Sequence, residues 1–484
     1  MRKVSKILPV ALTASVIFSA PWAVLAEGDI PGLKKDLIMN AVKAEGVIPE
    51  LSRDMVTVTG NYAGINSFFG VAFRTKYIDR WAISIKNEKE SLNDHLLDTA
   101  RIAHMLVLIK NKKFGGNMNV GRIAVLAMYH DLTEVITGDM PTPIKYGHPQ
   151  MKPIYNEVDA KANEELLSKL PEKFRKDFDP LLDRKEEEKD LWKLVKTADT
   201  MSAFIKCLIE RSRGSKDFDK IFDYIEGILL ANKEPEVQYF MKTFLPAFGY
   251  TYPEKLSTPE LKKDKAAAAN KTEGNIRELS ERTVTVAGEN AGENSFFGVA
   301  FRTKYIDRWA ISIKKENESL NDHLVDTARI AHMLALIKNE EFEGNMDVGR
   351  IAVLAMYHDL TEVITGDMPT PIKYGHPQMK PIYNEVDAKA NEELLSKLPE
   401  EFREDFEPLL DRKEEEKDLW KLVKTADTMS AFIKCLIERS RGSKDFDKIF
   451  DYIESVLLAN KEPEVQYFMK TFLPAFGYTY PENL

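Results

Sequence analysis

The residues best suited to chemistry lie between Ala127 and Pro143, a stretch that recurs letter for letter from Ala355 to Pro371. At helical spacing, Glu134 lies one turn beyond His130 and Asp131, so an imidazole and two carboxylates share one side of a helix. A carboxylate buried without a partner costs several kcal/mol, and such groups are normally kept beside a partner or an ion. The pattern therefore predicts a metal site, present twice in the chain.

Two further side chains on other predicted helices could complete this site. His95 lies in the first turn of one helix, and Asp199 lies in the middle of an apolar helical run. A single helical histidine is more often a packed core residue than a ligand, and a His-Asp pair alone is weak evidence. The order His, His-Asp, distant Asp is more specific, and the second half of the chain repeats it.

This order resembles that of the HD-domain metal-dependent phosphohydrolases, which are named after the His-Asp pair. Further motifs make the resemblance more specific. They are Asp79-Arg80-Trp81, Ala127-Met128-Tyr129-His130-Asp131, Glu134-Val135, Thr137 to Pro143, Lys196-Thr197-Ala198-Asp199 and Lys206-Cys207-Leu208. With these motifs the chain resembles most closely the bacterial 5'-deoxynucleotidases of the YfbR type, over about residues 66–250 and 294–478. One motif departs from the family. Asn93-Asp94-His95 stands where Ser-Glu-His is usual, and the shorter carboxylate could change the surroundings of the ligand.

The resemblance implies one divalent metal ion in each repeat. The implied ligands are His95, His130, Asp131 and Asp199 in copy 1 and His323, His358, Asp359 and Asp427 in copy 2. Mixed nitrogen and oxygen ligands suit Mn, Co, Fe, Ni or Zn better than Ca. The family favours cobalt or manganese.

The implied reaction is removal of the 5'-phosphate from nucleoside monophosphates, with deoxynucleotides preferred. Glu134 and Arg80, with Glu362 and Arg308 in copy 2, would activate water and clamp the phosphate. The residues that would hold the sugar and base are Trp81, Asp139, Met140, Pro141 and Thr142 in copy 1 and Trp309, Asp367, Met368, Pro369 and Thr370 in copy 2. Other interpretations remain: Trp81 as a core anchor, Asp139 as a turn residue and Glu134 on a solvated face.

Two alternatives to this 5'-deoxynucleotidase-like phosphoric monoester hydrolase stay open. One is a nucleotide-binding HD module with one or both sites inactive, and the other is an HD enzyme that acts on a different nucleotide. The retained Glu134 and Glu362 favour an enzyme, because a binding module has no need of a carboxylate that activates water.

The elements that must position these residues are helices, so we expect an all-α fold of two tandem HD-domain helical bundles. In copy 1 the expected helices are Asp94–Lys110, Val120–Thr137, Pro153–Lys169, Glu186–Arg213, Asp217–Ala231 and Pro235–Phe244. Ser91 and Asp94 have the spacing of a capping box, and Gly138 should end the second helix. The only short strand candidate is Val56–Thr59.

The chain is a duplication, since Pro31 aligns with Pro259 and Leu256 with Leu484, and roughly nine in ten residues agree from Glu45 onward. We divide it into residues 66–256 and 294–484 as HD copies, 27–65 as an N-terminal extension, and 257–293 as the linker and extension of copy 2. The charged differences between copies include Lys112, Lys113, Lys173 and Lys176 against Glu340, Glu341, Glu401 and Glu404. We interpret them as drift of a solvated face. Asn119 and Asp347, also different, are both good N-cap residues.

The first residues have the pattern of a secretory signal, residues 1–26. Arg2, Lys3 and Lys6 precede an apolar run from Ile7 to Ala26. We expect cleavage after Ala26, export to the periplasm or medium, and no membrane attachment afterwards. An uncleaved membrane anchor is the alternative.

Composition limits the possible partners. The chain has 484 residues, a net charge of −9 and no basic stripe, so nucleic-acid binding is disfavoured while a small nucleotide is not. Cys207 and Cys435 are equivalent residues in apolar runs and are expected to be core thiols. Members of the resembled family are commonly homodimers, which implies that the two copies dock as an internal pseudo-dimer. A dumbbell or a multichain assembly is the alternative.

Overall fold

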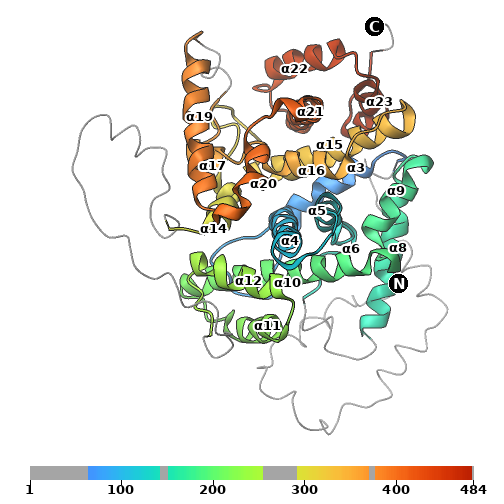
Figure 1. Cartoon of the computed structure of the whole chain (residues 1–484). Coiled ribbons are helices and arrows are strands. Elements are labelled where there is room, and N and C mark those ends of the chain that lie inside the picture. The colour runs from blue at the N-terminus through green and yellow to red at the C-terminus, as the bar shows by residue number, and fades with distance from the viewer. Residues whose placement is uncertain (1–63, 142–150, 254–291, 370–375, 482–484) are drawn as a thin grey trace, which may run out of the picture. The chain divides into compact units, whose positions relative to one another are not determined.

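The computed structural model describes residues 64–141, 151–253, 292–369 and 376–481 (Figure 1). Across these ranges the protein is all-α, and its only β pairing is an isolated bridge in each copy, Asp79 with Ser91 and Asp307 with Ser319. The signal segment 1–26, the strand candidate Val56–Thr59 and most of the linker lie outside them. No helix in the described ranges is long and apolar enough to span a membrane.

The helices of copy 1 recur in the same order in copy 2. Copy 1 contains α3 (Phe68–Ala72), η4 (Phe73–Tyr77), α4 (Leu92–Phe114), α5 (Val120–Tyr129), α6 (Glu134–Thr137), α8 (Met151–Ser168), α9 (Glu172–Leu182), η5 (Glu186–Glu188), α10 (Lys189–Ser212), α11 (Asp219–Ala231), α12 (Pro235–Thr243) and η6 (Leu245–Phe248). Copy 2 contains α14 (Phe296–Ala300), η9 (Phe301–Tyr305), α15 (Leu320–Glu341), α16 (Val348–Tyr357), α17 (Glu362–Thr365), α19 (Met379–Ser396), α20 (Glu400–Leu410), η10 (Glu414–Glu416), α21 (Lys417–Ser440), α22 (Asp447–Ala459), α23 (Pro463–Thr471) and η11 (Leu473–Phe476).

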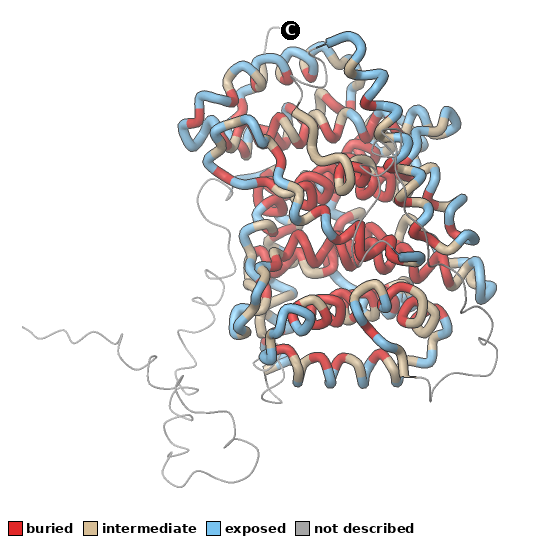
Figure 2. The backbone as a smooth tube through the Cα atoms, turned by 90° about the vertical axis from the view of Figure 1, so that its left-hand side faces the viewer, coloured by how far each residue is buried: buried red, intermediate tan, exposed pale blue. Residues whose placement is uncertain are grey.

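Helix α4 is the central element of copy 1. Its expected capping box is confirmed: Ser91 Oγ accepts from the Asp94 N–H, and the Asp94 carboxylate accepts from the Ser91 N–H. Every residue from Leu92 to Ile109 is buried, because α5, α10 and α12 pack around the helix and α15 of copy 2 covers it as well. Figure 2 shows this burial as the continuous red of the inner helices. Polar groups on such a helix must find partners, which fixes their positions.

The expected helix Val120–Thr137 is in fact two helices, so that prediction was wrong. Helix α5 ends at Tyr129, a turn covers residues 130–133, and α6 begins at Glu134. Within the turn the Leu132 N–H donates to the Tyr129 carbonyl, and the Glu134 N–H to that of Asp131. Because neither glycine nor proline marks this break, the sequence does not reveal it. Gly138, at φ 75°, ends α6 as expected.

Helix α9 was not anticipated, because prolines at positions 171 and 180 argue against a helix there. Pro171 precedes the first helical residue and costs no helical hydrogen bond. Pro180 lies inside the last turn, where it removes one backbone donor without ending the helix before Leu182. The N-caps at the start of α5 and α16 are confirmed: Asn119 and Asp347 each accept a backbone N–H three residues ahead.

The two copies contact each other through α4 and α5 of one and α15 and α16 of the other. Arg101, fully buried in α4, donates to the Ala300 carbonyl at 3.0 Å and to Thr303 Oγ1 at 3.1 Å. Gly121 and Gly349 meet at the crossing of α5 and α16. A Cβ on Gly121 would lie 2.7 Å from the Gly349 carbonyl carbon, so the helices approach this closely only because both residues lack one. The described residues of both copies belong to one compact unit.

Candidate active site

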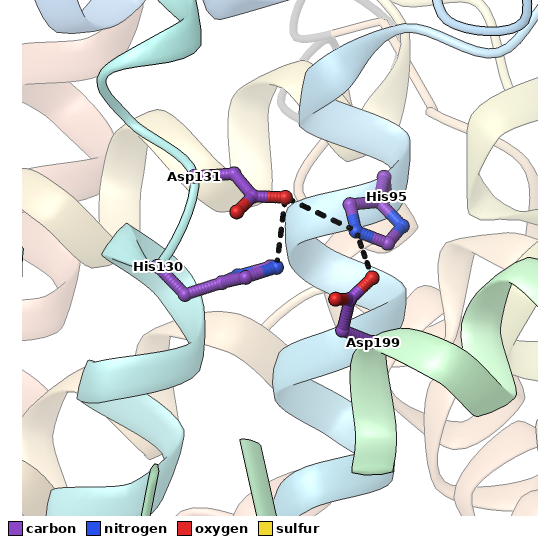
Figure 3. Close-up of side chains that lie close together, drawn as sticks. All are labelled: His95, His130, Asp131 and Asp199. Carbon is purple, nitrogen blue, oxygen red and sulfur yellow. Dashed lines mark ion pairs between the residues drawn. The ribbon is translucent and has the colours of Figure 1, made fainter. Parts of the chain in front are cut away.

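Four candidate ligands meet where α4, α5 and α10 converge (Figure 3). His95 comes from the first turn of α4, His130 and Asp131 directly follow α5, and Asp199 lies in the middle of α10. One ligand atom of each lies within 4.8 Å of the others. His95 Nε2 is 3.2 Å from Asp199 Oδ1 and 3.7 Å from Asp131 Oδ2, and His130 Nε2 is 3.1 Å from Asp131 Oδ2. The turn after Tyr129 allows both His130 and Asp131 to reach this point.

The other nitrogen of each imidazole is held by a neighbour. His130 Nδ1 is 2.7 Å from the Ala127 carbonyl oxygen, so Nδ1 donates and the neutral ring keeps its lone pair on Nε2. His95 Nδ1 is 3.2 Å from Ser202 Oγ. Both Nε2 atoms are buried and make no hydrogen bond of good geometry with the described residues. Two such nitrogens between two carboxylates fit a divalent cation.

The charges of the cluster also suit a cation. Burial lowers the pKa of His95, and the nearby Arg80 lowers it further, which favours the neutral imidazole. Burial opposes ionisation of Asp199, yet Lys196 and His95 hold the pKa of this carboxyl well below its usual range. His130 does the same for the pKa of Asp131. Burial opposes the charge of His130, but Asp131 raises the pKa of this histidine in return, so its ring must give up a proton when a cation binds. Ionised carboxylates and a neutral imidazole are the forms in which these groups bind metals.

A second group of charges lies beside the cluster. Arg80 Nη1 is 3.9 Å from Glu134 Oε2 and 4.0 Å from Asp139 Oδ1. Burial opposes its charge, but Glu90, Asp139 and Glu134 raise the pKa of Arg80 above its usual range. The structure thus brings together the arginine, the glutamate and the loop aspartate singled out in the sequence. A permanently charged guanidinium at this place can take two phosphate oxygens.

Trp81 has a strained backbone, with φ at 61°, and Trp309 repeats it at 63°. An aromatic residue adopts this region only where its surroundings impose it. The Trp81 N–H donates to Asp139 Oδ2 at 3.4 Å, the indole N–H donates to Glu90, and the ring packs on Phe218 at 5.2 Å between centroids. Trp81 therefore packs against the core and also ties the Asp139 loop to Arg80.

The other expected residues have varied positions. Met140, Pro141, Met368 and Pro369 are half-buried at the ends of their loops, and Thr142 and Thr370 lie outside the described residues. His104 is buried against copy 2, with Nδ1 3.4 Å from Tyr357 Oη. Cys207 and Cys435 are free, buried thiols, as expected.

Sequence reasoning missed Ser202, Glu90 and the role of Asp94. Ser202 could have been found, since it lies one turn beyond Asp199 on α10. Glu90 has no pattern that marks it. Asp94 Oδ1 accepts from Asn321 Nδ2 of copy 2 at 3.0 Å, and Asn93 Nδ2 donates to Asp322 Oδ1 in return. The motif that departs from the family therefore forms part of the contact between copies.

Copy 2 reproduces the cluster. His323 Nε2 is 3.2 Å from Asp427 Oδ1 and 3.8 Å from Asp359 Oδ2, and His358 Nε2 is 3.2 Å from Asp359 Oδ2. Arg308 is also buried. Despite that burial, the charges of Glu318, Glu362 and Asp367 raise its pKa above the usual range. Both copies therefore have the same candidate site.

Comparison with known proteins identifies the family. The YfbR-like 5'-deoxynucleotidases match residues 67–248 and again residues 295–476. The chain belongs to this family. A YfbR-like 5'-deoxynucleotidase of Vibrio parahaemolyticus is 46% identical over 182 residues, which cover 37% of this chain and 93% of that protein. One of Vibrio vulnificus is 44% identical over 181 residues, again 37% and 93%. One copy thus corresponds to almost a whole YfbR-like relative.

Similarity to solved structures is weaker. An HD phosphohydrolase of cyanophage S-2L, solved bound to dA and one catalytic Zn²⁺ ion, is 19% identical and covers 38% of this chain and 96% of that one. The TM-score is 0.28, which is too low to support an inference about this YfbR-like chain.

Proposed function

We propose that this protein is a metal-dependent phosphohydrolase that removes the 5'-phosphate from nucleoside monophosphates, with deoxynucleotides preferred. The observation that carries the proposal is the meeting of His95, His130, Asp131 and Asp199 within 4.8 Å, beside Arg80 and Glu134. Membership of the YfbR-like family supports it, because relatives that align with one whole copy are 5'-deoxynucleotidases.

The four ligands of each copy would hold one divalent ion, with two imidazole nitrogens and two carboxylate oxygens. When bound, such an ion polarises a phosphate oxygen and lowers the pKa of water. Mn, Co, Fe, Ni and Zn suit this mixed set, whereas Ca takes oxygen ligands. We propose cobalt or manganese.

The roles of the protein groups follow from their positions. Arg80 would bind the phosphate oxygens and keep the phosphorus atom beside the ligands. Glu134, 3.9 Å from Arg80 and not one of the four ligands, would accept a proton from the attacking water. A bond then forms from the water oxygen to phosphorus and the bond from phosphorus to O5' breaks. O5' takes up a proton from solvent, and Glu134 later returns its own proton to solvent. Trp81 and the loop from Asp139 would contact the sugar and base.

Both copies would be active in this account. Copy 2 has all four ligands, and Arg308 and Glu362 stand in place of Arg80 and Glu134. A nucleotide-binding module would need the arginine but no carboxylate to take a proton from water.

We also propose that the two copies act as an internal pseudo-dimer. Arg101 and its equivalent Arg329 support this, since each is fully buried and donates across the contact between copies. Covalent linkage raises the local concentration of each copy around the other. Mass and small-angle scattering measured on one sample would test it. One chain per particle with a compact profile is expected, and an extended dumbbell would contradict the proposal.

Export is the remaining proposal, and it depends on the signal-like residues 1–26. N-terminal sequencing of protein recovered from the medium or periplasm should begin at Glu27. An intact N-terminus in the membrane fraction would instead indicate an anchor.

The position of the bond cleaved is tested by phosphate release from a panel of nucleotides. The panel contains deoxynucleoside and ribonucleoside 5'-monophosphates, 3'-monophosphates and triphosphates at matched concentrations. We expect the highest kcat/KM with deoxynucleoside 5'-monophosphates. Higher efficiency on 3'-monophosphates or triphosphates would rule the proposal out.

A further inference from the structure

Four of the ion pairs between the copies have the same polarity, with the positive side chain in copy 1. Four lysines of copy 1 reach four carboxylates of copy 2. These pairs are Lys112 with Asp405 at 2.6 Å, Lys113 with Glu401 at 2.7 Å, Lys173 with Glu341 at 2.5 Å and Lys176 with Glu340 at 2.7 Å. They join α4 to α20 and α9 to α15.

Among the described residues, these lysines are the positions at which the otherwise similar copies reverse charge. We name Lys112, Lys113, Lys173 and Lys176 the lysine face, and Glu340, Glu341, Glu401 and Glu404 the glutamate face. Each member of one face is the sequence equivalent of a member of the other. Interpreting these differences as drift of a solvated surface was therefore incomplete, because seven of the eight side chains, all but Glu404, form ion pairs across the contact between copies.

Because the two copies have equivalent positions, the side chains that would meet in a contact between two copies 1, or between two copies 2, can be deduced. Lys113 contacts position 401, whose counterpart in copy 1 is Lys173. A contact between two copies 1 would therefore place Lys113 against Lys173, and Lys112 beside Lys176, with Asp177 as the one compensating carboxylate. A contact between two copies 2 would place Glu341 against Glu401 and Glu340 beside Glu404, with Asp405 adding a further negative charge. Like charges held face to face disfavour both pairings.

The remaining contacts do not discriminate between copies. Lys304 lies 3.5 Å from Asp98, and Lys76 lies 3.1 Å from Glu316 across the same contact. These residues, like Arg101 and Arg329, have identical counterparts in the other copy. They would therefore be available in any pairing.

One tyrosine position accommodates both signs of charge. Tyr239 in copy 1 donates from its hydroxyl to Glu401 at 2.9 Å. Its counterpart Tyr467 in copy 2 lies beneath Lys173, whose Nζ is 4.6 Å from the ring centroid. Lys113 Nζ also lies 4.8 Å from the Tyr239 ring centroid, so each of the two tyrosines contacts a lysine of the lysine face.

We infer that the lysine face and the glutamate face form a charge code that makes copy 2 the partner of copy 1 and excludes pairing of like copies. A duplicated chain with two identical faces could join copy 1 to copy 1 of a second chain, and copy 2 to copy 2 of a third, without closing. The opposite charges of the two faces disfavour both the contact of copy 1 with copy 1 and that of copy 2 with copy 2. The covalent linker then favours copy 2 of the same chain over copy 2 of another chain.

The test uses full-length chains with one face reversed. Changing the four lysines to glutamate gives a chain with two acidic faces, and changing the four glutamates to lysine gives a chain with two basic faces. In each variant alone, the two copies of a chain should dock less well than in the wild type, so its scattering profile should be more extended. Their mixture should form particles of two chains. The fraction of two-chain particles should be about tenfold higher in the mixture than in either variant alone, because only the mixture brings opposite charges together. The effect should disappear at about 1 M salt, where exposed charges are screened.

Two controls separate the code from general effects. Reversing the exposed lysines Lys89, Lys216, Lys220 and Lys233 adds the same charge at places where the described residues show no ion pair to copy 2, and it should leave mass and scattering unchanged. Reversing both faces together should restore the compact single chain, even if a variant with one reversed face folds poorly. Wild-type scattering tests docking itself.

Two outcomes would overturn the inference. One is a mixture that stays at one chain per particle while each variant unfolds at the wild-type midpoint. The other is a chain with both faces reversed that is no more compact in scattering than the variants with one reversed face.

Discussion

Arg101 in α4 of copy 1 donates from Nη2 to the Met356 carbonyl oxygen of copy 2, 3.1 Å away and two residues before His358. Met356 lies in the last turn of α16, and His358 follows that helix directly. A buried side chain of one copy therefore holds the backbone that presents a candidate ligand in the other. The candidate site of copy 2 therefore depends on a side chain of copy 1 for the position of its backbone, although each site has its own ligands.

Changing Arg101 to Met should affect the two sites unequally. It leaves the Met356 carbonyl without its donor, so ligand placement in copy 2 loosens. With the first site disabled by His130→Ala, we expect Arg101→Met to lower kcat about tenfold. With the second site disabled by His358→Ala, kcat should change much less. Arg101→Lys is the matched control for charge, and equal losses at both sites would mean that Arg101 acts only through stability.

The two sites should otherwise work separately. His130→Ala removes a ligand from copy 1 and should leave roughly half the activity, while His130→Ala with His358→Ala should leave almost none. The loss should appear as metal content that falls by one ion per chain at each step, with the helical circular dichroism unchanged. Complete loss in the single variant would show that copy 2 is inert or that the sites are coupled.

Glu134 is expected to act on kcat and not on the metal. Glu134→Gln keeps the shape of the side chain but removes the base, so in the His358→Ala background kcat should fall about 10²- to 10⁴-fold. Bound metal, measured on the same sample, should stay at the level of the parent variant. A loss of metal in step with activity would instead make Glu134 a ligand.

Asp98 should make stability depend on pH. Burial raises the pKa of Asp98 to about 7, although Lys304 and Arg101 oppose the rise. Because this folded-state pKa lies above the ordinary value of 3.8, the contribution of Asp98 to stability is complete below about pH 4 and is lost as pH rises through about 7. Asp98→Asn should therefore flatten the fall of the unfolding free energy between these pH values. The check is urea unfolding at several pH values, and an unchanged slope would contradict the assignment.

The parts of the site that could be predicted are those set by residue type and order. His95, His130, Asp131 and Asp199 were found because their order along the chain is specific, and Ser91 with Asp94 because a capping box is local. Such signals need no knowledge of the fold. The N-cap position shared by Asn119 and Asp347 was found in the same way.

What could not be predicted depends on partners distant in sequence. The break after Tyr129 has no glycine or proline, and the positive φ of Trp81 follows from its bonds to Asp139 and Glu90. Lys113 resembled any exposed lysine, because Glu401 lies far away along the chain. The contact between copies had to be seen before the charge differences gained a meaning.

The central claim is tested most directly by phosphate release from a deoxynucleoside 5'-monophosphate, with one preparation measured before chelation, after chelation and after return of each divalent metal. The account predicts full loss on chelation and recovery with a transition metal such as cobalt or manganese. The variant His130→Ala with His358→Ala, carried through the same steps, should never recover. Activity that survives chelation in the wild type, or that metal restores to the double variant, would contradict the account.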